Sequence, residues 1–452
     1  SHESRIFPEK KPKERRVPID AIATPPYQTG TPETIDDWRA YYERLEQMDA
    51  EVGRLLKELE ASGEADDTII VYCSDHGGVT LRSKRYLYDS GTRVPLIVSF
   101  PEKWQHLAPL APGSASERLV QFIDLPKTFL SLLGVEPPGV MPGRVFLGED
   151  VEPAPESVFL FSGRFDEAPD NSRAVTDGRW KYIRNFEPDR PLFQMLNYPM
   201  RQAGQVSQWE AYQAGATNDR QSAHYLPQQA EELYDTESDP HEVDNLAASE
   251  PEKLHAMRAR LRSHILETHD LGFIPEPMME AINVLKTQTV YSYGQNEENY
   301  PLPRILDLAI LASEGNPANQ SELVRAFGDG NPIIRYWALV GLRVLGARAQ
   351  DVDQLLEEAL ADPAPSVRIQ AAICLARQGR RERALGFLLH EAQTAYGDIH
   401  AAWALDGIKL LDAPEVLDGL GEAEVEGLKK GFNSKRIVNL LHSGGSVSRM
   451  PE

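Results

Sequence analysis

Apolar residues recur at helical spacing near the beginning of the chain. Between residues 31 and 62 they follow one another at intervals of three and four positions: Ile35, Trp38, Tyr41, Leu45, Met48, Val52, Leu55 and Leu59. This spacing places them on one face of a helix. Thr31 followed by Pro32 is a favoured helix start, and Gly63 is a favoured helix end. The pattern therefore predicts one long helix with a buried face.

Two short apolar runs without polar alternation follow this helix, at residues 68–73 and 94–100. Such runs are typical of parallel strands that are covered on both faces. A second helix is predicted from Asp124 to Leu133, with Gly134 at its end. Helices that alternate with buried strands predict an α/β layered fold for this part of the chain.

The pattern changes beyond residue 150. Short strand signals at 158–161 and 179–184 predict a small antiparallel subdomain over residues 151–270. Residues 271–301 are rich in Pro, Asn, Gln and Tyr and show weak periodicity, which is typical of a linker between folding units.

The last third of the chain repeats itself. Residues 331–338 and 364–371 align 33 positions apart, with Ala338 matching Ala371, and a weaker third copy follows at the same spacing. The pattern resembles HEAT repeats, in which neighbouring helix pairs stack to bury their apolar faces. It predicts an all-α solenoid over residues 302–440, with an irregular helical bundle as the alternative. In either case we expect packing there and no catalytic chemistry. A tail would follow at residues 441–452.

Charge, hydropathy and cysteine content exclude several classes of protein. The 452 residues contain 47 Lys and Arg against 69 Asp and Glu, a formal net charge of −22. This acidic balance argues against nucleic acid as a partner. The longest apolar runs are too short to predict a membrane span. Cys73 and Cys374 are too few for a disulfide framework or a cysteine-only metal site, and both are interpreted as buried thiols.

The candidate chemistry lies directly after the first apolar run, in Asp75, His76, Gly77 and Gly78. Ligands bind where the strands of a parallel sheet end. Because the glycines let the backbone turn, Asp75 and His76 can face one divalent cation together. The carboxylate supplies the oxygen that calcium or magnesium prefers. The alternative is that Asp75 caps a turn and His76 is an ordinary loop histidine.

Six segments in chain order together resemble the sulfatase family of the alkaline-phosphatase-like superfamily, heparan N-sulfatase-like enzymes in particular. They read MDAEVGRLLKELEASG, DDTIIVYCSDHGG, KRYLYDSGTRVPLIV, LVQFIDLPKTFLSLLG, DGRWKYIRNFEP and ELYDTESDPHEVDNLA. The resemblance covers about residues 1–270. It implies that residues 1–150 are the C-terminal part of a sulfatase α/β core and residues 151–270 its C-terminal antiparallel subdomain.

The resemblance also implies roles for four residues. Asp75 would be a metal ligand, usually of calcium with magnesium as the alternative, and His76 would coordinate the metal or touch the sulfate. Lys84 would bind the sulfate oxygens and assist the leaving oxygen, because an ammonium group offsets negative charge that grows in the transition state. His2 matches a family histidine that reaches the sulfate. Without the resemblance, Lys84 would be interpreted as a solvated loop lysine.

The family nucleophile is a formylglycine made from a Cys/Ser-x-Pro-x-Arg motif, and this sequence contains no such motif. We therefore expect the chain to be an incomplete, N-terminally truncated and inactive fragment of a sulfatase. The intact enzyme would hydrolyse sulfate esters or sulfamates. A phosphoester or phosphonate hydrolase of the same superfamily is one alternative, and a catalytically silent HEAT-repeat interaction protein is another.

The resemblance implies a sulfated carbohydrate or another sulfate ester as the substrate. It also implies a periplasmic or secreted location. The predicted solenoid over residues 302–440 offers a surface for a protein partner.

Overall fold

The computed structural model describes residue 13 and residues 16–285 and 288–442. Contacts divide the chain into two compact units, each built from three segments. Unit 1 comprises Ser1–Leu160, Ala174–Tyr182 and Leu233–Arg258, and unit 2 comprises Phe161–Arg173, Ile183–Glu232 and Ala259–Glu452. His2, a predicted site residue, lies outside the described residues.

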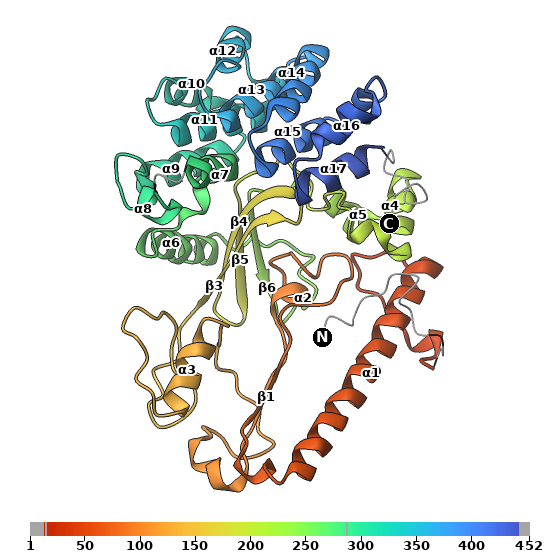
Figure 1. Cartoon of the computed structure of the whole chain (residues 1–452), viewed down its shortest axis with the longest axis vertical. Coiled ribbons are helices and arrows are strands. Elements are labelled where there is room, and N and C mark those ends of the chain that lie inside the picture. Colours follow the sequence, from red (N-terminus) through yellow and green to blue (C-terminus); the bar gives the residue numbers. More distant parts are fainter. Residues whose placement is uncertain (1–12, 14–15, 286–287, 443–452) are drawn as a thin grey trace. The chain divides into compact units, whose positions relative to one another are not determined.

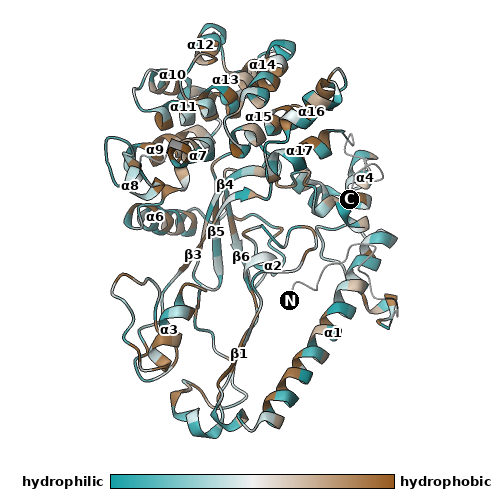
Figure 2. Ribbon diagram, in the orientation of Figure 1, coloured by the Kyte–Doolittle hydropathy of each residue, from teal (hydrophilic) through white to brown (hydrophobic). Residues whose placement is uncertain are grey.

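Unit 1 contains the predicted long helix as α1, Pro32–Ser62, which follows a short 3₁₀ turn at Ile19–Ala21. The hydroxyl of Thr31 caps the helix by accepting a hydrogen bond from the backbone N–H of Thr34 (3.2 Å), and Gly63 ends it with φ +77°. The two ends are thus confirmed. The predicted buried face is wrong, because the buried residues are Thr34, Asp37, Ala40 and Glu43, whereas the predicted apolar positions are only half-buried and Leu55 is 52% exposed. Figure 2 shows how hydrophilic and hydrophobic positions alternate along this helix.

The two apolar runs form β1, Ile70–Cys73, and β2, Leu96–Ser99, with a 3₁₀ turn at Ala65–Asp67 before β1. Their parallel, doubly covered arrangement was predicted and is wrong. The strands pair antiparallel, with Ile70 opposite Ser99 and Cys73 opposite Leu96, and Ile97 is 60% exposed. The physical reason is the connection, which returns the chain to the end of β1 that it left instead of crossing over the sheet.

Three further helical segments complete this part of unit 1. They are α2 (Asp89–Thr92), a 3₁₀ helix (Glu102–Leu107) and α3 (Asp124–Leu132). The predicted helix from Asp124 is confirmed to within one residue at its end, where Gly134 adopts φ +68°.

A second sheet contains four strands in the order β3-β4-β5-β6. Their bounds are β3 Val158–Phe165, β4 Ala168–Thr176, β5 Trp180–Asn185 and β6 Glu231–Asp235. The division between the two units falls within each of these strands. The connections after β3 and β4 are hairpin-short, so those neighbours run antiparallel as predicted for this region. The sequence patterns located β3 and β5 but missed β4 and β6.

Helices occupy stretches that the sequence patterns left irregular. The chain between β5 and β6 contains a 3₁₀ turn (Pro199–Arg201), α4 (Ala203–Gln213), α5 (Asp219–Ser222) and a second turn (Ala223–Tyr225). After α6 (Pro251–Glu267), the predicted linker contains a turn at Leu271–Phe273, α7 (Glu276–Leu285) and α8 (Val290–Gly294). Within this stretch, Phe273 and Tyr300 are buried.

The C-terminal part of unit 2 is a stack of helices (Figure 1). Its elements are α9 Leu302–Ser313, α10 Gln320–Phe327, α11 Pro332–Leu345, α12 Asp353–Ala359, α13 Pro365–Arg377, α14 Arg381–Thr394, α15 Asp398–Leu410, α16 Glu422–Leu428 and α17 Phe432–His442, with 3₁₀ turns at Pro317–Asn319, Gly346–Arg348 and Pro414–Leu417. Helices α11, α13, α15 and α17 begin at intervals of 33, 33 and 34 residues, and each contacts the next. Each also contacts the shorter or flanking helix that precedes it, α10, α12, α14 or α16.

The repeated alanines explain how these helices approach one another. Ala338, Ala371 and Ala404 occupy equivalent positions of α11, α13 and α15, and each is fully buried. A small side chain there lets neighbouring helices pack closely. Within the part of the chain that the structure describes, no helix is both long and apolar enough to cross a membrane.

Candidate active site

The candidate site lies on the loop of residues 74–93 that connects β1 to β2 within unit 1. Two backbone hydrogen bonds fold this loop onto itself, from the N–H of Gly77 to the carbonyl of Gly91 (2.9 Å) and from the N–H of Lys84 to the carbonyl of Gly78 (2.9 Å). The second bond brings Lys84 to the turn that follows Asp75 and His76. The three predicted residues of this region thus lie on one closed loop.

Glycine is required where the two arms of the loop cross. A Cβ atom on Gly77 would lie 1.8 Å from the carbonyl oxygen of Ser90, and one on Gly91 would lie 2.2 Å from the carbonyl oxygen of Ser83. Real Cβ atoms do not approach a carbonyl that closely. Any larger residue at either position would therefore push the arms apart.

His76 has the hydrogen bonding that suits a metal ligand. Its Nδ1 atom lies 2.7 Å from the carbonyl oxygen of Gly77. Because a carbonyl oxygen only accepts, Nδ1 carries the proton, and Nε2 of the neutral ring keeps its lone pair. Metal-binding histidines commonly donate their other ring N–H to such an acceptor. The carbonyl of His76 in turn accepts from the Ser74 hydroxyl (2.7 Å), which fixes the turn.

The Asp75 carboxylate lies beside the other ring nitrogen, with Oδ2 3.4 Å from Nε2 of His76. Its side chain is 84% exposed. Among the described residues no backbone N–H donates to it, so the alternative of a turn-capping aspartate finds no support in the hydrogen bonds. Asp75 and His76 present an oxygen and a nitrogen to the same point.

These two residues fit a divalent cation as part of a coordination shell. Calcium takes six to eight oxygen ligands and magnesium takes six ligands. In the described part of the chain, no group of three or more His, Cys, Asp and Glu side chains is placed to hold a metal ion. Asp75 and His76 alone would therefore supply only two of the donors that such a shell requires.

Backbone strain and positive charge mark the same loop. Arg82 and Arg85, which flank Lys84, adopt left-handed conformations with φ +63° and +88°. Each such non-glycine residue costs on the order of 1–3 kcal/mol, and such residues gather at functional sites. The loop also carries four basic side chains against two acidic ones in a chain of net charge −22.

Charged residues that the sequence analysis missed lie against this loop. Lys181 of β5 is fully buried and pairs with Asp89 and with Glu242, whose Oε1 is 3.0 Å from Nζ. Burial raises the pKa of Glu242, and Asp89 adds to the rise while Lys181 and Arg82 oppose it. The signal was present, because Lys181 and Glu242 lie in two of the six segments that carry the family resemblance, at residues 177–188 and 232–247.

Two family profiles match the part of the chain that contains this loop. The profile described as Sulfatase matches residues 7–135, and the profile described as N-sulphoglucosamine sulphohydrolase, C-terminal, matches residues 77–200. Residues 7–200 belong to the sulfatase family. The loop that joins β1 to β2 lies within this sulfatase region, and much of it lies within both matches.

Curated relatives are sulfatases as well. The ulvan-active sulfatase of Formosa agariphila is 34% identical over 265 residues, which are 58% of this chain and 43% of that protein. The human N-sulphoglucosamine sulphohydrolase is 29% identical over 278 residues, 56% of this chain and 52% of that protein. The chain thus spans about half the length of these relatives.

Similarity to solved structures is lower. A structure described as a complex with the substrate D-glucosamine-2-N,6-O-disulfate aligns with a TM-score of 0.36 at 23% identity, covering 51% of this chain and 40% of that chain. The family assignment of this sulfatase region therefore depends on sequence.

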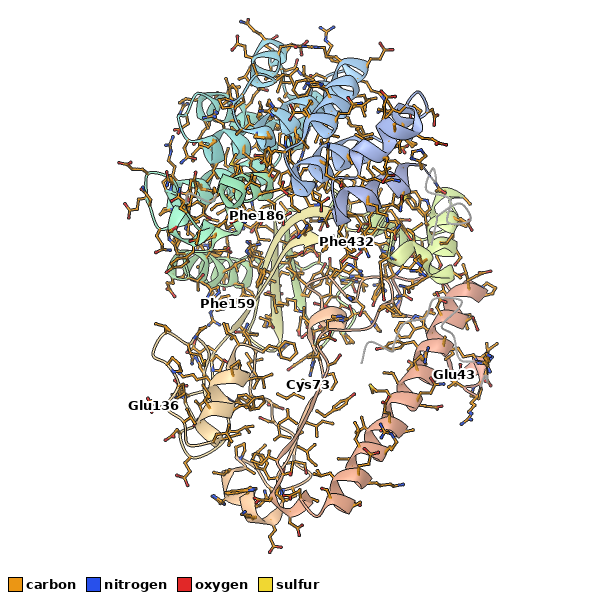
Figure 3. All side chains as sticks on the ribbon, in the orientation of Figure 1. Glu43, Cys73, Glu136, Phe159, Phe186 and Phe432 are labelled. Atoms are coloured by element: carbon orange, nitrogen blue, oxygen red, sulfur yellow. The ribbon has the colours of Figure 1, made fainter. Side chains whose placement is uncertain are left out.

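The two cysteines differ in a way that the sequence did not predict. Cys73, at the end of β1 (Figure 3), is exposed, whereas Cys374 is buried as predicted. The interpretation of Cys73 as a buried thiol is wrong because β1 belongs to a two-stranded ribbon whose faces are only partly covered. Burial raises the pKa of Cys374 to about 12.

We expect one of the two thiols to react in the folded protein. The thiolate is the reactive form of cysteine. Burial of Cys374 disfavours its ionisation and prevents the reagent from reaching its sulfur. Titration with a chromogenic disulfide should give one fast equivalent, and Cys73→Ser should abolish it. A second fast equivalent, or a fast equivalent that survives in Cys73→Ser, would contradict the difference in burial.

Proposed function

We propose that this protein acts as a sulfatase that hydrolyses sulfate esters or sulfamates of a sulfated carbohydrate. The observation that carries the proposal is the loop of the sulfatase region. It brings Asp75, Nε2 of His76 and the backbone of Lys84 together within one closed loop.

Each residue has a role that its chemistry supports. Asp75 and His76 would hold part of a divalent cation's shell, with calcium the ion implied by the family resemblance. A cation bound there supplies positive charge to the oxygens of the substrate. Lys84 would bind sulfate oxygens and stabilise charge on the leaving oxygen. His2 is proposed to reach the sulfate, and the nucleophile is proposed to be a formylglycine that does not come from this sequence.

The choice between ester and sulfamate depends on the relatives. One relative is named an ulvan-active sulfatase, and another is named an N-sulphoglucosamine sulphohydrolase. Both names imply a sulfated sugar as the substrate. Because a profile for the C-terminal part of the second enzyme matches residues 77–200, the sulfamate of an amino sugar is the first substrate to test.

The helical stack has a proposed role outside catalysis. The regular intervals of α11, α13, α15 and α17 support a HEAT-like solenoid that stabilises the enzyme or recruits a protein partner. A periplasmic or secreted location is proposed from the same family resemblance that implies the substrate.

The test is hydrolysis by the protein purified from its own host. Release of sulfate from N-sulfoglucosamine or 4-nitrophenyl sulfate, faster than release of phosphate from 4-nitrophenyl phosphate, supports the sulfatase proposal. Faster release of phosphate would favour a phosphoester hydrolase. Absence of both activities would favour an interaction protein built around the helical stack.

Asp75 gives a second test that needs no turnover. Calcium that binds the folded chain raises its melting temperature by mass action. Asp75→Asn removes a carboxylate charge from the shell and should at least halve the calcium-induced rise at millimolar calcium. Asp66→Asn is the matched control, because Asp66 is exposed and lies outside the loop. An equal calcium response in Asp75→Asn and the unchanged chain would remove Asp75 from the metal site.

A further inference from the structure

Three segments that are far apart in the sequence meet at the catalytic loop within unit 1. They are the loop itself, Lys181 of β5, and residues 241–242 that follow β6. One oxygen of the Glu242 carboxylate pairs with Lys181, and the other accepts a hydrogen bond from the backbone N–H of Asp89 (2.7 Å). Glu242 therefore joins a buried cation of the sheet to the backbone of the loop.

Arg82 of the loop also contacts residues 241–242 directly. Its Nη1 donates to the carbonyl of His241 (3.0 Å), and its Nη2 donates to the carbonyl of Glu242. The guanidinium also stacks on the ring of Tyr88, 3.6 Å from the centroid. Arg82 is 5% exposed, so these contacts are made away from water.

We propose that Glu242, Lys181 and Arg82 form a positioning clamp that fixes the loop bearing Asp75, His76 and Lys84, without touching substrate. This proposal rests on the proposed function in one respect, namely that this loop is the catalytic one. The contacts themselves do not depend on it.

The composition of the clamp supports positioning over simple packing. Two cations, Arg82 and Lys181, face two anions, Asp89 and Glu242, and buried ion pairs are often no more stabilising than well-packed apolar residues. What charged pairs add is a defined geometry, because each hydrogen bond requires its partner at one place. Glu242 and Arg82 also both adopt left-handed backbone, with φ +50° and +63°, which the surrounding contacts must maintain.

The clamp predicts local loosening of the loop when Glu242 is changed. In Glu242→Gln the neutral amide cannot satisfy both Lys181 and the Asp89 N–H, so we expect amide hydrogen exchange in the peptide 74–93 to accelerate by about tenfold or more. Exchange in the peptide 124–133, from α3, should stay unchanged. The matched control is Glu237→Gln, since Glu237 follows the same strand but its side chain is 67% exposed.

A second variant keeps the proposal falsifiable if the first one folds poorly. Lys181→Met keeps the length of the side chain but removes the buried ammonium that joins Asp89 and Glu242. It should accelerate exchange in the same peptide, and combination with Glu242→Gln should add less than the sum of the two single effects. Unchanged exchange in the loop, or equal acceleration across α3 and the loop, would overturn the clamp.

Activity separates the clamp from the sulfatase proposal. In the protein produced by its own host, Glu242→Gln should lower kcat/KM by about tenfold and should have a smaller effect in a Lys84→Ala background, because part of the effect acts through the position of Lys84. A purely structural residue would lower the rate equally in both backgrounds. Local loosening in a protein without any sulfatase turnover would keep the clamp and reject the proposed function.

Discussion

Arg343→Ala is expected to remove about 3–5 kcal/mol of the free energy of unfolding of unit 2. Arg343 of α11 is fully buried, and its guanidinium donates to Glu187 (2.7 Å) and to both oxygens of Asp189 (3.0 Å each). A third donor reaches the amide oxygen of Gln370 of α13 (2.6 Å). The variant would leave Glu187 with Arg190 and Asp189 with Arg377, so each buried carboxylate loses one of its cations, and breaking a buried charge network is among the most destabilising changes in a protein interior.

Urea unfolding of the full chain measures this effect, with a matched control on the same stack. Arg380→Ala also removes an ion-paired arginine, but Arg380 is 63% exposed and its partner Asp353 is 50% exposed. We expect that control to change stability by less than about 1 kcal/mol. A loss below about 1 kcal/mol in Arg343→Ala would show that the two acids find other partners.

In the same unfolding experiment, the folded chain should lose stability as the pH is lowered. Burial raises the pKa of Asp189, but the Arg343 and Arg377 guanidinium groups outweigh it and lower the value to about 2. An aspartate with a depressed pKa adds stability above its ordinary pKa near 4, and this stability is lost as the pH falls towards 2. Arg343→Ala should make that loss smaller.

Lys84→Ala is expected to lower kcat/KM by about 10²–10³ in the protein produced by its own host, because one missing charge partner in a preorganised site costs that much. Melting temperature should change little, since the Lys84 side chain is only half-buried. The matched control is Lys103→Ala, which removes an exposed lysine paired with Asp67 (2.5 Å) in the same unit. A loss of kcat/KM of less than tenfold would contradict the proposed role and indicate that Lys84 is a solvated loop lysine.

Local signals predicted local structure well. The cap at Thr31 and the glycines at 63 and 134 gave helix ends to within about a residue. These signals work because capping and left-handed backbone are decided by neighbours in the sequence. Asp75 and His76, in the turn after β1, were also predicted from their own residue types, and their role stays a prediction.

Pairing between distant segments was not predictable in the same way. The apolar composition of β1 and β2 indicated doubly covered parallel strands, but the direction of pairing depends on the connection and the covering on other elements. The clamp shows the same limit, since Lys181 and Glu242 are 92 and 153 residues from Asp89. The family resemblance marked the segments of Lys181 and Glu242, but it did not show which distant charge each of them pairs with. His2 stays a prediction, because it lies outside the described residues.

The two partners of each buried ion pair in unit 2 are synthesised at different times. Glu187 leaves the ribosome 156 residues before Arg343, and Arg190 leaves it 216 residues before its partner Asp406. At roughly 5–20 residues per second, the earlier charges wait on the order of ten to forty seconds for their partners. Until then a segment destined for the interior stays hydrated and open to chaperones and proteases. Translation of the last helices therefore completes a folding unit whose first charged residues emerged long before.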